Sequence, residues 1–360
     1  MIVEIKSGLE SDLEKLFKIL REKTKVIGPR ISVDGNSIVY EELNDYEELA
    51  RDVEDLQEPG NYRLFKGKFF RHGFDSPKKY LFPPTLKIIR VYKGLRIEPY
   101  DYQNMEITFF AIKPCDSAAI KIMDKTFSWN EDVYYKTIRE KLTIIVENCI
   151  DPGKTCFCAT MGTGPRVKEN FDIAYTKING KVLFEVGSEK GGKILKSLNE
   201  LREASVDDIT SLIKTMEEAE KKAKAPFNIE NLPKELEEKI MSKDLWRKVS
   251  EKCVGCGNCT MVCPTCFCFD IYDESHLDEY VDRIRYWDSC FTYRYAEVAG
   301  GNFRPDLWAR YRQWLLHKFS YWEKQFDTLG CVGCGRCITW CPMGIDIRES
   351  IIRVLGGGEK

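Results

Sequence analysis

The sequence predicts an α+β protein, with a mixed α/β domain over residues 1–225 followed by a mostly helical domain over residues 226–360. In the first half, short apolar runs typical of buried strands alternate with helical patterns. In the second half, apolar residues recur every three or four positions along two long segments. A charged run that ends at a proline separates the two halves, which places the domain boundary near residue 225.

The outer elements of the first half follow from periodicity and turn chemistry. Residues 11–23 space their apolar side chains along one face of a helix. Residues 30–43 predict two short strands around an Asp-Gly-Asn turn. Residues 174–186 predict a second hairpin, because they turn at an Asn-Gly pair that tolerates positive φ angles.

The central elements of the first half are two apolar runs. Residues 107–112 and 142–148 have the length of buried strands, and each leads into a loop that contains cysteine. Residues 116–127 between them follow a helical pattern. We expect Asp116 or Ser117 to cap this helix.

Three helical segments account for most of the second half and its approach. Residues 205–225 begin with a short apolar helical face and continue with mostly charged residues. Residues 233–249 resume helical spacing, and residues 305–326 carry an aromatic stripe at steps of three and four. Such a stripe is more often a helix packed onto its own domain than a cofactor site. Its basic residues favour a solvated or partner-facing surface over one that binds nucleic acid.

Composition describes a soluble globular chain. Of its 360 residues, 43% are apolar and 31% are charged, and the net charge is −2. This balance argues against a nucleic-acid-binding protein held by bulk electrostatics. The N-terminus lacks a secretory pattern, and no apolar run approaches the length of a membrane span. We therefore expect a cytoplasmic protein.

Fifteen cysteines are the main compositional anomaly. Disulfides rarely persist in a reducing cytosol, where clustered cysteines usually bind metal or take part in redox chemistry. Their grouping supports that interpretation: four lie between residues 115 and 158, six between 253 and 268, one at 290, and four between 331 and 341.

One cysteine phrase occurs twice. "CVGCGNCTMVCP" begins at Cys253 and "CVGCGRCITWCP" begins at Cys331. Three thiolates spaced as C-x2-C-x2-C suit one cubane, and the fourth cysteine of such a phrase ligates the other cluster in two-cluster ferredoxins. The pattern predicts two [4Fe-4S] clusters, held by a first set, Cys253, Cys256, Cys259 and Cys341, and a second set, Cys331, Cys334, Cys337 and Cys263. Zinc, which favours separated C-x2-C pairs, and eight unliganded thiols are the alternatives.

Four further cysteines define an N-terminal set: Cys115, Cys149, Cys156 and Cys158. Two follow the predicted central strands and two form a C-x-C within a loop rich in glycine. If those strands are neighbours in one sheet, all four thiols reach the same edge. We expect a third iron–sulfur cluster there, [4Fe-4S] in preference to [2Fe-2S], with structural zinc and unliganded cysteines as alternatives.

Cys266, Cys268 and Cys290 remain. They could form an extra metal or sulfur-reactive site, or pack beside the neighbouring clusters and influence their potentials without binding iron. The sequence favours the packing interpretation but leaves both open.

The combined motifs resemble a known family. They are "KPCD", "CFC" followed by "GTGP", "CPTCFC", "RYWDSC", "AGGNFRP", "HKFSYW" and "CVGCGRC…CPMGIDI". They are similar to the iron–sulfur β subunit of cytoplasmic sulfhydrogenases and to its relative, the iron–sulfur subunit of anaerobic sulfite reductase. The long helices around the repeats also resemble the α-helical ferredoxin class, which implies a mostly helical C-terminal domain.

The resemblance implies an electron-relay subunit without a catalytic residue of its own. Single electrons would pass between a flavin-bearing NAD(P)H-oxidoreductase subunit on one side and, on the other, a [NiFe] hydrogenase module or a sirohaem sulfite reductase. We expect no flavin or nicotinamide site in this chain, because it lacks a G-x-G-x-x-G at a strand-to-helix turn. In a competing hypothesis, Cys266, Cys268 and Cys290 would make this subunit itself reduce sulfur or polysulfide. In another, the chain is an interaction protein stabilised by zinc.

Overall fold

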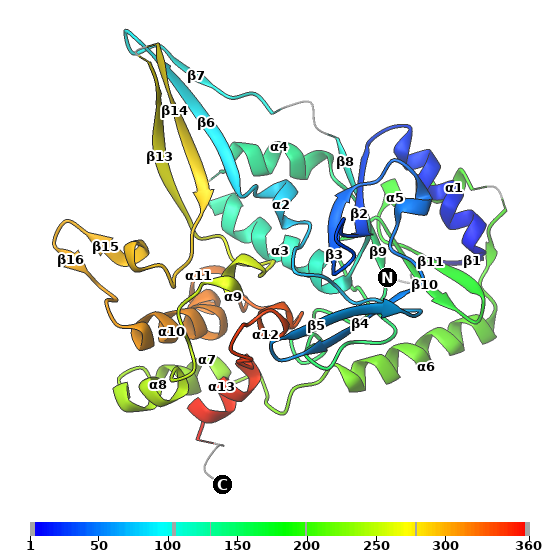
Figure 1. The fold of residues 1–360 in the computed structure, drawn as a ribbon. Coiled ribbons are helices and arrows are strands. Elements are labelled where there is room, and N and C mark those ends of the chain that lie inside the picture. Colours follow the sequence, from blue (N-terminus) through cyan, green and yellow to red (C-terminus); the bar gives the residue numbers. More distant parts are fainter. Residues whose placement is uncertain (1–3, 103–105, 130, 199, 278, 357–360) are drawn as a thin grey trace.

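The computed structural model describes residues 4–102, 106–129, 131–198, 200–277 and 279–356. Its centre is an eight-stranded sheet of order β12-β1-β11-β10-β9-β8-β2-β3 (Figure 1). The strands are β1 Ile5–Gly8, β2 Lys25–Ile31, β3 Ile38–Glu42, β8 Ile107–Ile112, β9 Thr143–Glu147, β10 Ile173–Ile178, β11 Lys181–Val186 and β12 Arg202–Glu203. The helices around them are α1 Glu10–Arg21, α3 Pro114–Trp129, α4 Val133–Lys141, α5 Glu189–Lys196 and α6 Val206–Lys222.

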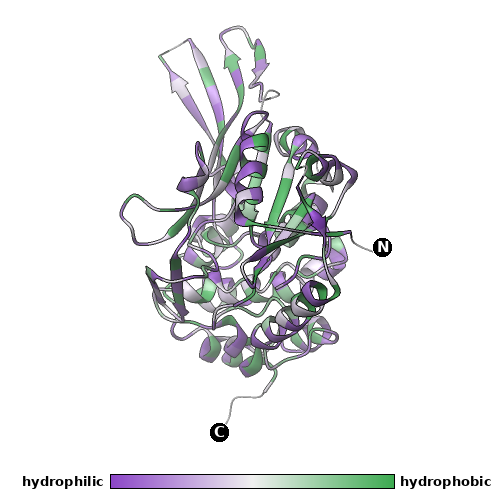
Figure 2. Cartoon of the chain, turned by 90° about the vertical axis from the view of Figure 1, so that its right-hand side faces the viewer, coloured by the Kyte–Doolittle hydropathy of each residue, from purple (hydrophilic) through white to green (hydrophobic). Residues whose placement is uncertain are grey.

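The four central strands, β2, β8, β9 and β10, run parallel, and the strands expected over 107–112 and 142–148 are neighbours, as β8 and β9. Both faces of β8 are buried, because successive side chains point to opposite sides of a strand. Phe110 packs against Phe17 of α1, with ring centroids 5.4 Å apart. Phe109 joins the core beneath α3 and α4 on the other face. The central strands are accordingly among the most hydrophobic segments in Figure 2.

Both hairpins predicted from turn chemistry are confirmed. β2 pairs with β3 and β10 pairs with β11, each antiparallel. The turn glycines Gly35 and Gly180 both have a φ of 73°, which a residue with a side chain rarely adopts.

A bulge at the end of β8 directs the chain into α3. The register with β9 shifts between Phe109 and Ile112, and Ala111 between them has a φ of 57°. Left-handed backbone at a non-glycine residue costs on the order of 1–3 kcal/mol. Bulges of this kind re-aim the residues that follow, here those leading to Cys115.

A second sheet projects from the body of the molecule in Figure 1. Its order is β13-β14-β6-β7, with bounds β13 Phe269–His276, β14 Tyr280–Trp287, β6 Thr85–Tyr92 and β7 Ile97–Pro99. We call this sheet the arm. Two further hairpins are β4 Val53–Glu58 with β5 Asn61–Lys66, and β15 Glu297–Val298 with β16 Gly301–Asn302.

The predicted α+β class is confirmed, although strands of the arm make the second half less helical than expected. The helices there are α7 Leu232–Glu237, α8 Lys243–Val249, α9 Asn258–Met261, α10 Leu307–Leu316, α11 Trp322–Phe326, α12 Arg336–Thr339 and α13 Ile347–Val354. A π-helical turn, His317–Tyr321, joins α10 to α11 into the expected aromatic helix. Short elements complete the chain: α2 Lys78–Leu81 and the 3-10 turns Tyr46–Glu48 and Tyr293–Ala296.

The helix expected over 233–249 is instead two helices, α7 and α8. The turn between them leaves the carbonyl of Lys239 free to accept a hydrogen bond of 2.9 Å from the Trp246 indole. Met241, expected on the apolar face, lies in this turn and is exposed.

The division into two domains near residue 225 stays a prediction. α6 ends at Lys222, close to that boundary. However, β6 from the first half pairs with β14 from the second, so the arm contains strands from both sides of the expected domain boundary. Within the described ranges, no helix has the length and apolarity to cross a membrane.

We predict that Phe110→Ala lowers the stability of the full chain by about 3–5 kcal/mol, because the substitution leaves a cavity between α1 and the sheet. Phe303→Ala is the matched control, because Phe303 is 78% exposed. The measurement is the midpoint of anaerobic thermal unfolding. Equal midpoints for the two variants would contradict the position of this core.

Candidate iron–sulfur centres

The two copies of the repeat fold into the same local structure. In the first copy, the Gly255 N–H donates to the sulfur of Cys253 at 3.4 Å. In the second, the Gly333 N–H donates to the sulfur of Cys331, also at 3.4 Å. A left-handed glycine then begins a one-turn helix in each copy, α9 or α12. Backbone hydrogen bonds to sulfur are one means by which proteins set cluster potentials.

The structure brings the four thiols of the first set together. Cys253, Cys256, Cys259 and Cys341 line one pocket. Its wall is apolar, with Phe291, Tyr311 and Trp314 among its residues. Burial, and then the thiols of the other three members, raise the pKa of Cys259 well above its ordinary value. Cys341 therefore lies with the first copy of the repeat, as the crossover pattern predicts.

The second set converges in the same way. Burial raises the pKa of Cys337 well above its ordinary value, and the thiols of Cys331, Cys334 and Cys263 add to that rise. Burial raises the pKa of Cys331 to about 12. Binding iron requires thiolates, so metal binding at this set is coupled to the release of protons.

A buried lysine faces the second set. The Lys318 Nζ lies 3.1 Å from the sulfur of Cys263 and 3.3 Å from that of Cys266. The π-helical turn carries this side chain, and π-bulges often occur at functional sites. Among the described residues, no carboxylate lies within ion-pair distance of Lys318. A buried ammonium is costly without an anion, and iron-bound sulfur supplies one.

The N-terminal set gathers at the carboxyl edge of β8 and β9. Cys115 lies in the first turn of α3, and Cys149 follows β9. Burial, followed by the neighbouring thiols of Cys156 and Cys149, raises the pKa of Cys158 well above its ordinary value. Cys158 also contributes to the raised pKa of Cys115, after burial and the charges of Asp116 and Cys334. The predicted meeting of these four thiols is what the structure shows.

The predicted cap of the helix after Cys115 is wrong. α3 begins at Pro114, so Asp116 and Ser117 lie inside its first turn. Proline suits the first helical position because its missing N–H would have no partner there. The Asp116 carboxylate instead accepts two hydrogen bonds from the Arg336 guanidinium, at 2.8 and 2.9 Å. Both side chains are fully buried, and sequence reasoning did not anticipate this pair.

The remaining cysteines fall into two neighbourhoods. Cys266 lies against Cys263 and the Lys318 amine. Cys268 and Cys290 lie against each other at the base of the arm. The two neighbourhoods adjoin, because the Cys266 thiol also contributes to the raised pKa of Cys290, after Cys268 and burial.

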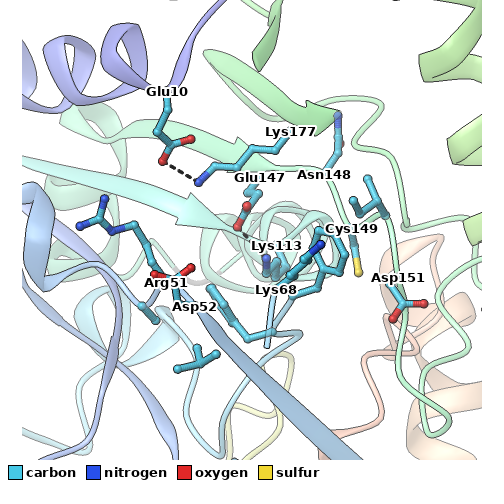
Figure 3. Close-up of a pocket in the computed structure, with 15 residues that line it drawn as sticks. Glu10, Arg51, Asp52, Lys68, Lys113, Glu147, Asn148, Cys149, Asp151 and Lys177 are labelled. Carbon is cyan, nitrogen blue, oxygen red and sulfur yellow. Dashed lines mark hydrogen bonds and ion pairs between the residues drawn. The ribbon is translucent and has the colours of Figure 1, made fainter. Parts of the chain in front are cut away.

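A polar pocket of about 350 Å³ opens beside Cys149 (Figure 3). Lys113 pairs with Glu147 at 2.7 Å on its wall, and Lys177 pairs with Glu10 at 2.9 Å. The sulfur of Cys149 lines the pocket, so the N-terminal set reaches the surface there. Because its walls come from separated stretches of chain, no local sequence pattern reveals it.

The residues present fit iron–sulfur clusters. Each of the three sets brings four thiols together, and backbone N–H groups donate to sulfur in the first and second sets. The Lys318 ammonium also faces the second set, without a carboxylate partner among the described residues, and such surroundings suit anionic metal–sulfur groups. When bound, such clusters supply one-electron redox chemistry. The fold and its thiols define an iron–sulfur protein of the electron-transfer class.

The comparisons with known proteins agree. Residues 252–345 match the family model of the 4Fe-4S dicluster domain. The sulfhydrogenase 2 subunit beta of Pyrococcus furiosus is 33% identical over an alignment of 352 positions, which covers 94% of this chain and 96% of that protein. The chain belongs to the family of sulfhydrogenase β subunits. The sequence-based identification is thereby confirmed.

Equivalent glycines of the two copies offer a matched test of the site. A Cβ at Gly333 would lie 2.6 Å from the backbone of Phe157, whereas one at Gly255 would meet only the flexible end of Leu307. Both substitutions to alanine carry the left-handed cost of about 1–2 kcal/mol. We predict that Gly333→Ala costs about 1–3 kcal/mol more, and that it also lowers iron content.

The midpoint of anaerobic thermal unfolding and the iron content per chain provide the two measurements. Gly255→Ala is the control, since it changes the same backbone angle outside that contact. Equal losses in the two variants would contradict the close contact between the Gly333 loop and the loop of the N-terminal set.

Proposed function

We propose that this chain is the electron-relay subunit of a sulfhydrogenase-type complex. Two [4Fe-4S] clusters in the first and second sets, and a third in the N-terminal set, carry single electrons. They connect a flavin-bearing NAD(P)H-oxidoreductase subunit to a [NiFe] hydrogenase module. The observation that carries the proposal is the contiguous arrangement of the three thiol sets.

The second set lies between the other two. The Cys334 carbonyl accepts a hydrogen bond of 3.6 Å from the thiol of the N-terminal Cys156. On the other side, Cys259 of the first set lies near enough to Cys337 to contribute to its raised pKa, after burial and the second set itself. The order is therefore N-terminal set, second set, first set.

Both ends of this row reach the surface. Cys256 of the first set is exposed, and Cys149 of the N-terminal set lines the polar pocket of Figure 3. Between these ends, Cys263 and Cys334 of the second set are buried, and Cys331 and Cys337 are half-buried. A row with an accessible thiol at each end suits transfer between two partners, without substrate chemistry in this chain.

The likeness to a sulfhydrogenase β subunit supports the hydrogenase module as the partner over a sirohaem sulfite reductase. The relay interpretation requires no catalytic residue. It also accommodates Cys266, Cys268 and Cys290 outside the three sets.

We predict about twelve irons per chain, four for each of three cubanes, in protein prepared without oxygen. Cys149→Ala removes the N-terminal cluster and lowers the count to about eight, and Cys337→Ala lowers it to about eight by removing the second cluster. Elemental analysis measures iron and zinc together. Ser205→Ala, at an exposed helix cap, is the control and keeps the full count.

About eight irons in the unaltered chain would eliminate the third cluster. Zinc in place of iron would eliminate the relay altogether.

We predict that Cys337→Ala in the assembled complex abolishes NAD(P)H-linked hydrogen turnover and leaves dye-linked hydrogen oxidation by the catalytic module unchanged. The reason is that loss of the middle cluster separates the two accessible ends. Activity assays with both electron acceptors measure this. NAD(P)H-linked turnover that persists in a variant shown to lack that cluster would contradict the order of the row.

A further inference from the structure

Cys268 and Cys290 lie at the base of the arm. Cys268 directly precedes β13, and Cys290 follows the end of β14 by three residues. The Asp288 N–H donates to the Cys268 carbonyl at 3.0 Å, which extends the pairing of the two strands past their ends. The hairpin therefore holds these two cysteines side by side.

Their thiols are in contact. The Cys290 thiol and the Tyr295 hydroxyl lie close enough to the sulfur of Cys268 to lower the pKa of Cys268 to about 6. Polar hydrogens beside a sulfur favour its charged form, so Cys268 is the more readily ionised thiol of the two. Cys266 is directed elsewhere, toward Lys318 at 3.3 Å.

The two sulfurs differ in access. Cys268 is half-buried and its neighbours Phe269 and Tyr295 are about two-fifths exposed, at 41% and 40%. Cys290 is only 9% exposed and lies behind it.

Ser289 fixes the loop that carries Cys290. Its hydroxyl oxygen accepts from the Phe291 N–H at 3.1 Å and from the Thr260 hydroxyl at 2.7 Å. An accessible thiol with a resolving thiol held behind it is the arrangement of a dithiol redox site.

We propose that Cys268 and Cys290 form a redox-active dithiol that exchanges with small disulfides. The Cys268 thiolate attacks one sulfur of the disulfide RSSR, which breaks its S–S bond, forms a mixed disulfide and releases RS⁻. Cys290 loses its proton to the solvent and attacks the Cys268 sulfur, which forms the Cys268–Cys290 disulfide and releases the second RS⁻.

In sum, two protein thiols and RSSR give one protein disulfide and two RSH. The small disulfide is the oxidant, and a small dithiol reverses the reaction. This activity goes beyond the proposed relay and requires no electron from its clusters.

The test equilibrates the iron-loaded full chain, without oxygen, with mixtures of oxidised and reduced dithiothreitol. Free thiols are then alkylated, and peptides are identified by mass spectrometry. We expect a peptide pair linked through Cys268 and Cys290 whose abundance rises with the ratio of oxidised to reduced dithiothreitol. Its absence at every ratio overturns the proposal.

Three variants test which cysteines form the disulfide. Cys268→Ser and Cys290→Ser each remove the linked pair and keep the iron content of the unaltered chain. Cys266→Ser, the matched control, retains the linked pair. A loss of about four irons in either of the first two variants would show that these cysteines bind a cluster, which overturns the proposal. If the linked pair forms in a chain that binds no iron, the result contradicts the proposed electron relay and supports the dithiol proposal.

Discussion

The arrangement of the three thiol sets depends on one close approach between loops distant in sequence. The Phe157 N–H donates to the Gly333 carbonyl at 2.7 Å, between Cys156 and Cys158 on one side and the second repeat on the other. A Cβ at Gly333 or Gly335 would lie 2.6 Å from atoms of the 155–158 loop. The glycines of the repeat thus serve two purposes: they shape the turn around sulfur, and they let the N-terminal set lie directly against the second set.

A buried ion pair supports the same contact. Arg336, within the second repeat, binds Asp116 next to Cys115, and the Tyr40 hydroxyl also donates to that carboxylate at 3.0 Å. Ion pairs of this kind recover their desolvation cost only with good geometry and further hydrogen bonds. Here both conditions hold. The pair therefore ties α3 to the C-terminal helices at the place where two sites meet.

Local patterns predicted much of this structure, because they depend on near neighbours in the chain. Both hairpins followed from turn residues, and the adjacency of β8 and β9 brought Cys115 and Cys149 together as expected. Contacts across long stretches of chain could not be predicted. β6 pairs with β14 about half the chain away, and Asp116 was expected to cap a helix because nothing nearby in sequence points to Arg336. Which cysteines bind iron stays a prediction, since the spacing of cysteines in the sequence indicates which thiols lie close together but not whether iron is bound to them.

The distribution of positive charge accounts for how a buried middle site could accept an electron. An added electron is stabilised by water near an accessible site, and Cys256 and the pocket at Cys149 provide such access at the two ends. Beside buried thiols there is little water, so the protein must supply the opposing charge. At the second set it does so with Lys318, which is 3% exposed and lies 3.1 Å from the sulfur of Cys263. Arg71 and Lys113, which are 8% and 5% exposed, act in the same way on Cys149 of the N-terminal set. Buried cations therefore accompany the two sets that contain buried thiols, and the first set, which contains none, is open to solvent at Cys256.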